Sequence, residues 1–506
     1  MNEAQKIFSA DQLREADLAT IRNEPIAPID LMERAAGKCA DWLQQHYSKA
    51  YKLYFFCGKG NNGGDGLAMA RILAGAGYTI QLFLLAANDQ LSDDCRQNKN
   101  RLLQTNPEII REINNITQLP EPCSQAVFVD ALFGTGLSGE ISGLHASVIN
   151  WINEKECPVI SLDIPSGLFA DKSSVKNQCI VKATVTLSFQ FPKLAFLFPE
   201  NEAYTGNWEI LPIGIDPEFI QKINTRNWLI THYCLRGILK KRNRFSHKGN
   251  YGHALLVAGS YGKIGAAQLA AKACLRSGVG LLTTMLPQCG YDSMQTAIPE
   301  AMVITGDEVN QISGFVKTDS YQAIGIGPGI GCAEQTQQTF LHLLQNNPSP
   351  MVIDADALNI LGMHKDWLSF VPENSILTPH PGEWERLAGK NEHHFLRQEA
   401  QLAFSIKWKV YIVLKGANTC TTTPSGLAYF NNSGNPGMAK GGSGDLLTGM
   451  ITALLAQSYS PLHAALLGVY LHGFAGDLAA EKFGQAGMMA TDIADMLPEA
   501  FLRMDT

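Results

Sequence analysis

Short apolar runs that lead directly into glycine-rich or acidic segments set the strongest limit on how this chain can fold. The run Leu53–Cys57 is followed by KGNNGGDG, then by the helical stretch LAMARILAGAG, and then by a second apolar run from Thr79. Two further apolar runs end at Asp130 and Asp163. Strand, glycine-rich turn, helix and strand in this order are typical of a parallel sheet with helices on both faces. The first half is therefore predicted to be a doubly wound α/β domain.

The second half repeats this order with a different sequence. Apolar runs precede four positions: Gly259, Gly327, Asp354 and Lys415. Long helical stretches rich in Ala and Leu follow Gly265 and Asp445. A chain of 506 residues is long enough for two or three domains. We expect two α/β domains, covering residues 1–225 and 226–506.

Composition excludes several classes of protein. Forty Lys and Arg against 47 Asp and Glu give a net charge of −7, which does not favour binding to nucleic acid or to an acidic membrane surface. The 11 cysteines are odd in number and form no C-x-x-C pair, as expected for reduced thiols. The N-terminal segment is charged from its start, and no apolar run approaches the ~18 residues of a membrane span. A cytoplasmic enzyme is the interpretation that fits.

The basic stretch Leu239–Asn250 lies near the expected junction between the halves. A solvated linker explains it best, and a contact with ligand phosphates is the alternative.

Polar side chains cluster after three of the apolar runs in the first half. Asn61, Asn62 and Asp65 lie in the glycine-rich segment 58–66, and Asp130 ends a later run. Asp163 and Ser166 follow another apolar run. Parallel strands place their carboxyl ends at one edge of the sheet, so these groups can converge there. Their oxygens suit a group 1 or group 2 cation, and a carboxylate among them could instead act as a general base. Each Asp could also simply cap a helix.

The segment GNPGMAKGGSGD (Gly434–Asp445), ahead of a long helical stretch, carries the most information in the second half. Gly441, Gly442 and Gly444 allow the backbone to approach a phosphate closely, and the following helix directs its positive end at the anion. Asp445 would then face a hydroxyl held near that phosphate and could act as its base. The structural alternative is a glycine-rich turn with Asp445 as a helix N-cap.

At these residues the chain resembles the bifunctional NAD(P)H-hydrate repair enzymes. KGNNGGDGLAMAR, DALFGTGLSG and DIPSGL are similar to the epimerase half, from about Ser9 to Asp216. The resemblance implies a Rossmann-like domain whose Asp163 handles a proton, with K⁺ bound by Asn62, Asp130 and Ser166. It also implies contacts with the hydrated dinucleotide from Asn61, Asn62, Gly63, Gly64, Asp65, Gly134, Thr135, Gly136, Leu137, Ser138, Gly139, Glu140 and Asp163. Asp171-Lys172-Ser173 departs from the family's usual Asp-Thr-Gly turn.

The second half resembles the dehydratase of the same family, which has a ribokinase-like fold. The matching segments include HKGNYGHALLVAGS, GIGPGIG, DADALN, TPHPGE, KGANT and GGSGD. The resemblance implies a hydrate pocket formed by Ala266, Gly329, His380 and Asp445. It implies that the nucleotide is held by Lys415, Gly416, Ala417, Asn418, Thr419, Asn435, Gly437, Lys440, Gly441, Gly442, Ser443 and Gly444. Lys440 departs from the small hydroxyl residue that is usual there, and it could contact a phosphate or point to solvent.

The implied activity is repair of hydrated NADH and NADPH. One domain interconverts the R and S hydrates, and the other dehydrates the S form at the expense of ADP, with Mg²⁺ on the phosphates. Small molecules are the expected partners, and the chain is expected to form a homo-oligomer. Two alternatives remain: a ribokinase-like kinase of a small alcohol joined to a dinucleotide-binding domain, or a non-catalytic binding module in the first half.

Overall fold

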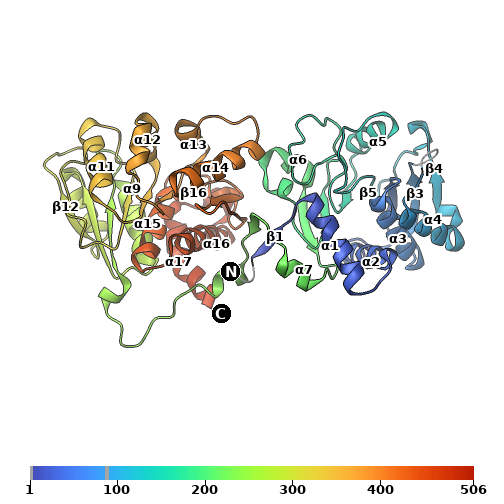
Figure 1. Ribbon diagram of the computed structural model, residues 1–506, viewed down its shortest axis with the longest axis horizontal. Helices are drawn as coiled ribbons and strands as arrows, with labels where there is room; N and C mark the ends of the chain where they lie inside the picture. Colours follow the sequence, from blue (N-terminus) through green and yellow to red (C-terminus); the bar gives the residue numbers. More distant parts are fainter. Residues whose placement is uncertain (1–3, 86–89, 506) are drawn as a thin grey trace. The chain divides into compact units, whose positions relative to one another are not determined.

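The computed structural model describes residues 4–85 and 90–505, and it divides into two compact units. The N-terminal unit comprises residues 6–225 with 393–395, and the C-terminal unit comprises residues 226–392 and 396–505 with the N-terminal segment up to Gln5. Each unit has its own sheet and its own helices (Figure 1). In the described part of the chain, no helix is long and apolar enough to cross a membrane.

The N-terminal unit contains a seven-stranded, fully parallel sheet in the order β4-β3-β2-β5-β6-β7-β8. Its strands are β2 (Lys52–Cys57), β3 (Thr79–Leu84), β4 (Ile110–Glu112), β5 (Ala126–Ala131), β6 (Val159–Leu162), β7 (Val185–Phe189) and β8 (Asn207–Leu211). Its helices are α1 (Ala10–Asn23), α2 (Pro28–His46), α3 (Asn61–Gly75), α4 (Asp93–Thr105), α5 (Gly143–Glu154), α6 (Glu202–Thr205) and α7 (Pro217–Lys222). A short strand, β1 (Gln5–Ile7), precedes them.

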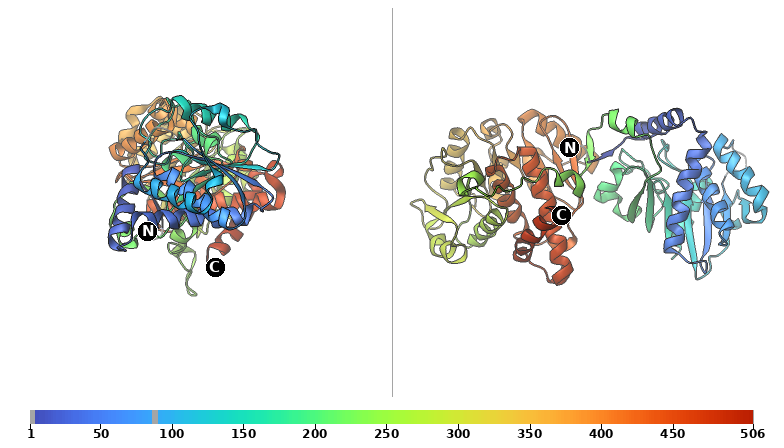
Figure 2. Two further views of the ribbon diagram at one scale, coloured as in Figure 1. Left: turned by 90° about the vertical axis from the view of Figure 1, so that its right-hand side faces the viewer. Right: turned by 90° about the horizontal axis from the view of Figure 1, so that it is seen from below.

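Alternate residues of the central strands enter two separate cores. Leu53 and Phe55 pack with residues of α2 and α3, whereas Tyr54 and Phe56 pack with residues of α5. This alternation buries both faces of the sheet, as a parallel sheet requires. The helices on the two faces can be followed in Figure 2. The chain order reverses between β2 and β5, and ligands bind beyond the carboxyl ends of the strands at such a point.

The C-terminal unit has a mixed sheet in the order β9-β18-β17-β16-β15-β14-β13-β10-β11-β12, parallel from β12 to β16 and antiparallel at β17. Its strands are β9 (Asn227–Leu229), β10 (His253–Val257), β11 (Leu281–Leu286), β12 (Met302–Thr305), β13 (Ala323–Ile326), β14 (Met351–Ile353), β15 (Ile376–Leu377), β16 (Tyr411–Leu414), β17 (Thr419–Thr422) and β18 (Ala428–Asn431). Its helices are α8 (His232–Arg236), α9 (Ile264–Arg276), α10 (Tyr291–Ala297), α11 (Glu334–Asn346), α12 (Ala355–Met363), α13 (Pro381–Ala388), α14 (His394–Trp408), α15 (Ser443–Ala456), α16 (Pro461–Gly487) and α17 (Ala490–Asp505).

This sheet is also covered on both faces. Leu256 belongs to a core built with α9, α15, α16 and α17, and Leu255 belongs to a second core built with α11, α12 and α13. Both units are therefore α/β, as expected.

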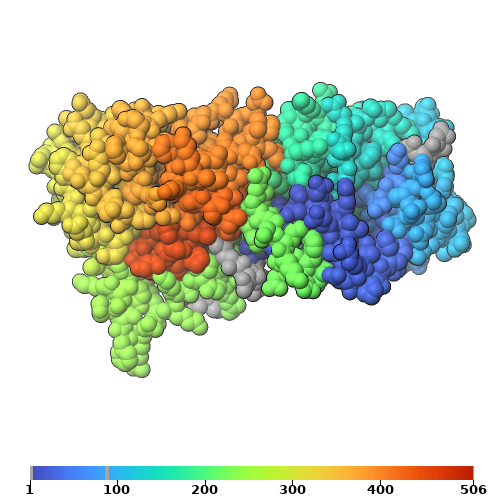
Figure 3. Space-filling model, viewed as in Figure 1, coloured from blue at the N-terminus to red at the C-terminus, as the bar shows by residue number. Residues whose placement is uncertain are grey.

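Two details differ from the sequence prediction. The segment 58–66 was expected to be a loop, but α3 begins at Asn61, so its glycines lie in the first turns of a helix. They are there because the helix packs closely: a Cβ on Gly63 would meet the Gly58 carbonyl oxygen at 1.8 Å, and one on Gly66 would meet the Cys57 sulfur at 2.7 Å. The basic stretch 239–250 is not the junction, because it lies wholly within the C-terminal unit. It contains the exposed Phe245 and is the green segment at the lower left of Figure 3.

We predict that Gly449→Ala destabilises the C-terminal unit. A Cβ at this position in α15 would lie 2.0 Å from the Ala270 carbonyl oxygen of α9, so the two helices would have to separate. Overpacking of this kind costs about 1–3 kcal/mol, which lowers the midpoint of urea unfolding. Gly362→Ala in α12 is the matched control, because its Cβ makes only ordinary contacts of 3.5 Å, and the midpoint should stay unchanged or rise. An unchanged midpoint for Gly449→Ala would contradict this packing account.

Candidate active sites in the two units

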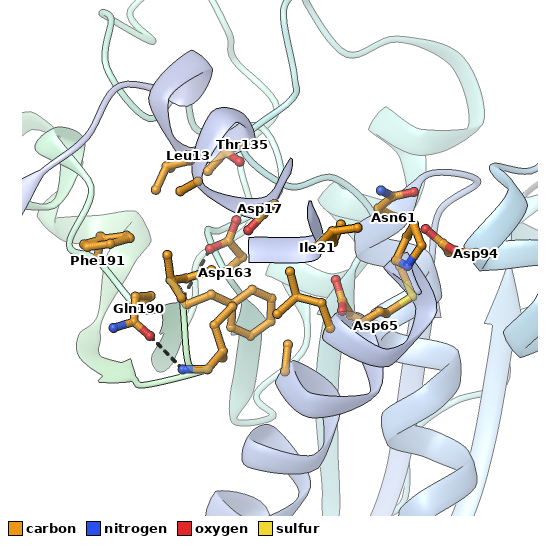
Figure 4. A pocket seen from close by; sticks show the side chains of 18 of the residues that line it. Leu13, Asp17, Ile21, Asn61, Asp65, Asp94, Thr135, Asp163, Gln190 and Phe191 are labelled. Atoms are coloured by element: carbon orange, nitrogen blue, oxygen red, sulfur yellow. Dashed lines mark hydrogen bonds between the residues drawn. The ribbon is translucent and has the colours of Figure 1, made fainter. Parts of the chain in front are cut away.

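A cavity of about 150 Å³ lies in the N-terminal unit beside the carboxyl end of β6 (Figure 4). Its polar lining comes from several elements: Asp17, Asn61, Asp65, Asp94, Thr135, Asp163, Gln190 and Lys193. Leu13, Ile21 and Phe191 are among its apolar walls. The cavity therefore brings together four of the expected site residues, Asn61, Asp65, Thr135 and Asp163, with others that the sequence had not indicated.

Asp163 and Lys193 form the central ion pair of this cavity. The side chain of Lys193 is only 1% exposed, and its ammonium also donates to Ser188 Oγ (2.9 Å). Asp163 has a φ of +65°, a conformation that costs a non-glycine residue of order 1–3 kcal/mol and is concentrated at functional sites. The backbone strain and the buried cation together hold the Asp163 carboxylate at the edge of the cavity.

Two further carboxyl groups in the cavity are poor at ionising. Burial, reinforced by the charges of Asp163 and Asp17, raises the pKa of Asp65 well above its usual range. The pKa of Asp17 is raised to about 7 by desolvation and by Asp163, against the opposing effect of Lys193. One lysine thus faces several carboxyl groups, and not all of them carry a charge at neutral pH.

The residues expected to bind a cation lie next to this cavity, at the ends of β5 and β6. The buried carboxylate of Asp130 accepts hydrogen bonds from Ser166 Oγ (2.5 Å), Ser166 N (2.8 Å) and Ser161 Oγ (2.8 Å). Desolvation raises the pKa of Asp130, while these hydrogen bonds lower it. Asn62 is buried, and neither polar atom of its side chain has a hydrogen-bond partner in the described structure. An orphaned amide beside a buried carboxylate and a hydroxyl suits a bound cation.

The segment Gly134–Glu140 forms an irregular loop after β5. Only Thr135 of this segment lines the cavity, and Gly134 lies beside Asn62, with 3.4 Å between its would-be Cβ and that of Asn62. The sequence Asp171-Lys172-Ser173, which replaces the family's usual Asp-Thr-Gly turn, makes two contacts of its own. Lys172 Nζ donates to the carbonyl oxygen of Ser138 (3.3 Å), and Asp171 accepts from Ala10 N (2.9 Å). Both side chains tie the 171–173 turn to neighbouring segments of the same unit.

A larger cavity, of about 750 Å³, lies in the C-terminal unit around the start of α15. Nine residues expected at the nucleotide site line it: Lys415, Gly416, Ala417, Thr419, Asn435, Lys440, Gly441, Ser443 and Gly444. Asn418, Gly437 and Gly442 are not among its lining residues. Gly437 instead packs against Met488 and Gln485, where a Cβ would approach to 2.6 Å, and Gly442 has a φ of +94° as the residue before α15.

Side chains of helix α16 hydrogen-bond to the glycine-rich segment Gly434–Asp445 that borders this cavity. Asp477 accepts hydrogen bonds from Gly434 N (2.9 Å) and from Asn435 Nδ2 (3.0 Å). His472 is hydrogen-bonded to Ser443 Oγ (3.2 Å), and burial lowers the pKa of its imidazole to about 4, so it is neutral at physiological pH. Gly473 allows the segment to approach, because a Cβ there would lie 2.3 Å from Ser433 Oγ. The shape of the glycine-rich segment therefore depends on one face of α16.

Lys440 is exposed and lines the cavity, and its ammonium is held by backbone carbonyl groups. Its ammonium donates to the carbonyl oxygens of Ala486 (2.7 Å) and Met488 (2.5 Å), beyond the kink at Gly484 in α16. Lysine at this position, in place of the family's usual small hydroxyl residue, thus ties the glycine-rich segment to the end of α16.

Asp445 lies in the first turn of α15, three positions after Gly442, the N-cap residue. The alternative in which Asp445 is the N-cap is therefore wrong. Burial and the neighbouring Asp354 raise the pKa of Asp445 to about 6, although Lys415 lowers it. Lys415 Nζ donates to Asp354 Oδ1 (2.8 Å) and lies 3.8 Å from Glu383. Burial lowers the pKa of Lys415, but Asp354 and Glu383 outweigh it and keep the lysine charged.

The four residues expected in the hydrate pocket are only partly brought together. Gly329, with φ +63°, lies against Ala266, at 3.1 Å from its would-be Cβ to that of Ala266. His380 lines the large cavity and also caps α13, because its Nδ1 accepts from Gly382 N (3.0 Å). Asp445 is not among the residues that line the large cavity, but burial and the negative charges of Asp354 and Asp356 act on its carboxyl group and raise its pKa.

Several residues of the two sites were not predicted from the sequence: Asp17, Asp94 and Lys193 in the first, and Asp356, Glu383, His472 and Asp477 in the second. Lys193 carried a usable signal, because it is the one charged residue in the run VTLSFQFPKLAFLF. Asp354 and Asp356 belong to the DADALN segment, where they flank Ala355, a non-glycine residue with a φ of +47°. Asp17 lies on a helix with many polar residues, so nothing in its neighbourhood marked it.

Each of the two units matches a known protein family. The family model described as NAD(P)H-hydrate dehydratase matches residues 254–499, and the one described as YjeF-related protein N-terminus matches residues 28–195. The solved dehydratase of Bacillus subtilis, co-crystallized with ATP/Mg²⁺ and described as ADP/ATP-dependent, is 35% identical over 54% of this chain and 97% of its own, with a TM-score of 0.48.

Similarity to curated relatives extends over almost the whole chain. The bifunctional NAD(P)H-hydrate repair enzyme of Moorella thermoacetica is 36% identical, covering 97% of this chain and 96% of its own. The enzyme of the same description from Escherichia coli is 31% identical, covering 97% and 93%. The expected fold class, a Rossmann-like unit followed by a ribokinase-like α/β unit, agrees with the two sheets and the two family matches. The chain therefore belongs to the family of bifunctional NAD(P)H-hydrate repair enzymes.

Proposed function

We propose that this chain repairs hydrated NADH and NADPH in two steps. Residues 1–225 interconvert the R and S hydrates, and residues 226–506 dehydrate the S hydrate to NAD(P)H while ADP is converted to AMP and inorganic phosphate. The observation that carries the proposal is common to both units: a lysine that lines a cavity acts on a neighbouring carboxyl group, Lys193 as the ion-pair partner of Asp163 and Lys415 through its charge on Asp445.

In the first step the stereocentre is the ring carbon that carries the added hydroxyl. This carbon is labile because the ring nitrogen can share its electron pair and release the hydroxyl. Asp163 is the proton-handling group, since its ion pair with Lys193 and its strained backbone hold it at the cavity. The loop Gly134–Glu140 and the start of α3 supply the further contacts with the dinucleotide.

The second step needs a better leaving group than hydroxide. Asp445 takes the proton of the ring hydroxyl, whose oxygen attacks the terminal phosphate of ADP, and inorganic phosphate then departs as the ring double bond forms. Above pH about 6 Asp445 is mostly ionised, as this role requires. The backbone N–H groups at the start of α15 and Lys415 face the phosphates.

The nucleotide is proposed to bring Mg²⁺ with it. No group of three or more His, Cys, Asp or Glu side chains within the described ranges could hold a metal by itself. Asp354, Glu383 and Asp445 nevertheless cluster around Lys415, and a polyphosphate would add negative charge to them. Mg²⁺ usually binds through one or two carboxylates and substrate phosphates, and it would supply neutralisation of that charge.

A cytoplasmic location and a homo-oligomeric state remain predictions. All 11 cysteines are free, which supports a reducing compartment. Gel filtration with light scattering would establish the number of copies.

Substituting each of the two carboxylates in turn separates the two activities. We expect Asp163→Asn to lose at least 100-fold in epimerisation and to dehydrate the S hydrate at the wild-type rate. Asp445→Asn should epimerise normally, bind ADP and fail to dehydrate. Both rates are measured on purified R and S hydrates, by chromatography for epimerisation and by dihydronicotinamide absorbance for dehydration. Full epimerisation by Asp163→Asn, or full dehydration by Asp445→Asn, would remove the corresponding assignment.

Potassium dependence tests the cation site. K⁺ would be held by Asn62 Oδ1, Asp130 and Ser166 Oγ, where it would offset the charge of the Asp130 carboxylate. We expect epimerisation to fall at least tenfold when a bulky organic cation replaces K⁺, and dehydration of the S hydrate to stay constant, because Asn62, Asp130 and Ser166 all belong to the N-terminal unit. Asn62→Ala should abolish the stimulation by K⁺. Equal epimerisation in K⁺ and in the organic cation would contradict a cation at this place.

Asp477→Ala tests whether α16 shapes the nucleotide site. The substitution removes both hydrogen bonds to the segment at Gly434 and Asn435, each worth roughly 1.5–3 kcal/mol for a charged acceptor. We expect the KM for ADP to rise about tenfold or more, with a smaller change in kcat. Glu481→Gln is the matched control on the exposed face of the same helix. A KM for ADP that stays at the wild-type value in Asp477→Ala would show that the segment holds its shape without α16.

A further inference from the structure

Asp17 interrupts the apolar face that α1 turns toward the N-terminal cavity. Leu13, Asp17 and Ile21 follow one another at intervals of four residues and all line the cavity, so they lie on one face of the helix. The flanking members of this face are apolar and pack with the core that contains Phe8 and Phe191. No hydrogen bond joins the Asp17 carboxyl group to any residue of the described ranges. The residue is exposed as a whole, so its carboxyl group can meet both solvent and a ligand of the cavity.

The groups facing Asp17 come from three sides. Asp163 and Lys193, at the ends of β6 and β7, act most strongly on it, and Figure 4 shows Asp17 beside Asp163. Asp65 from α3 and Asp94 from α4 lie further around the cavity. Asp65 is only 8% exposed, and no hydrogen bond to its carboxyl group is found among the described residues. An unpartnered, buried carboxyl group lining the same cavity shows that this space is shaped for a polar or cationic ligand.

Epimerisation requires a proton donor that Asp163 and Lys193 do not supply. Hydroxide leaves poorly, so the bond from ring carbon to oxygen breaks readily only when the oxygen receives a proton. The Lys193 ammonium is committed to Asp163, to Ser188 Oγ and to the carbonyl oxygens of Phe189 and Phe191. Asp65 is only 8% exposed and its pKa is raised well above its usual range, so it gives up a proton poorly at neutral pH. Asp17 lines the cavity, and its side chain also keeps an exposed surface.

On the basis of the proposed epimerase function, we propose that Asp17 is a second catalytic residue of that site and is the acid that protonates the departing hydroxyl. The Asp17 proton passes to the hydroxyl oxygen, the carbon–oxygen bond breaks, and water leaves. The ring nitrogen's electron pair forms a carbon–nitrogen double bond, which leaves a flat, positively charged ring beside the carboxylates. Water then adds to the opposite face of the ring carbon, and its proton goes to Asp163. Exchange with solvent restores the starting protonation of both groups.

The protonation behaviour of Asp17 agrees with this role. A catalytic acid works best when its pKa lies near the working pH, and desolvation together with Asp163 brings the pKa of Asp17 to about 7. The protonated form is the active one, so epimerisation should be fastest below pH about 7 and should fall as the pH rises above it.

The test compares Asp17→Asn, Asp17→Glu and the matched control Glu15→Gln, which lies on the exposed side of the same helix. We expect epimerisation to fall at least 100-fold in Asp17→Asn and to stay unchanged in Glu15→Gln. Asp17→Glu should keep at least a tenth of the wild-type rate, with the alkaline fall of its pH profile displaced. Dehydration of the S hydrate should be unchanged in all three variants.

Two results would overturn the inference. Epimerisation by Asp17→Asn within threefold of the wild-type rate would show that Asp17 is not the acid. A wild-type alkaline fall in the pH profile that persists in Asp17→Asn would show that another group titrates. Both are distinct from failure of the proposed function itself, in which the wild-type chain would not epimerise either hydrate at any pH.

Discussion

In each unit, one lysine offsets the charge of several carboxyl groups, and the rest of the site depends on this balance. Lys193 faces Asp163, with Asp17 and Asp65 nearby, and Lys415 faces Asp354, with Glu383 and Asp445 nearby. Because burial and like charges both disfavour ionisation, the pKa of Asp65 lies well above its usual range, that of Asp17 is raised to about 7 and that of Asp445 is raised to about 6. The N-terminal cavity therefore offers both a base and an acid without any change of fold, whereas Asp445 of the C-terminal unit is mostly ionised at neutral pH.

Close backbone approach is the second requirement, and the two units meet it differently. In the N-terminal unit the glycines of α3 let the helix begin directly against β2 and β5, which brings Asn62 beside the end of β5. In the C-terminal unit the glycine-rich segment before α15 stays irregular, and Asp477 and His472 of α16 give it a shape. Similar glycine-rich sequences thus serve helix packing in one unit and an anion-binding surface in the other.

The sequence predicted the parts of this structure that follow from local pattern. Apolar runs ending in glycine or aspartate indicated parallel strands, and the shared edge of such strands brought Asp130 and Ser166 together as expected. The start of α3 was misplaced, because glycine indicates conformational freedom and here serves close packing. Asp17 and Asp477 were not found, because both lie within helices and their partners come from distant segments. Whether Asp445 was a cap or a free carboxylate depended on a shift of three residues in the start of α15, which sequence alone does not settle.

The central claim is that the two sites act in sequence on one pair of epimers. It is tested most directly by following dihydronicotinamide absorbance from an equal mixture of R and S hydrates, with and without ADP and Mg²⁺, while assaying inorganic phosphate. The account predicts complete recovery that requires the nucleotide, with one phosphate released for each NAD(P)H restored. Recovery that stops near half would contradict epimerisation by this chain. A phosphorylated product without recovered absorbance would contradict dehydration and indicate a kinase instead.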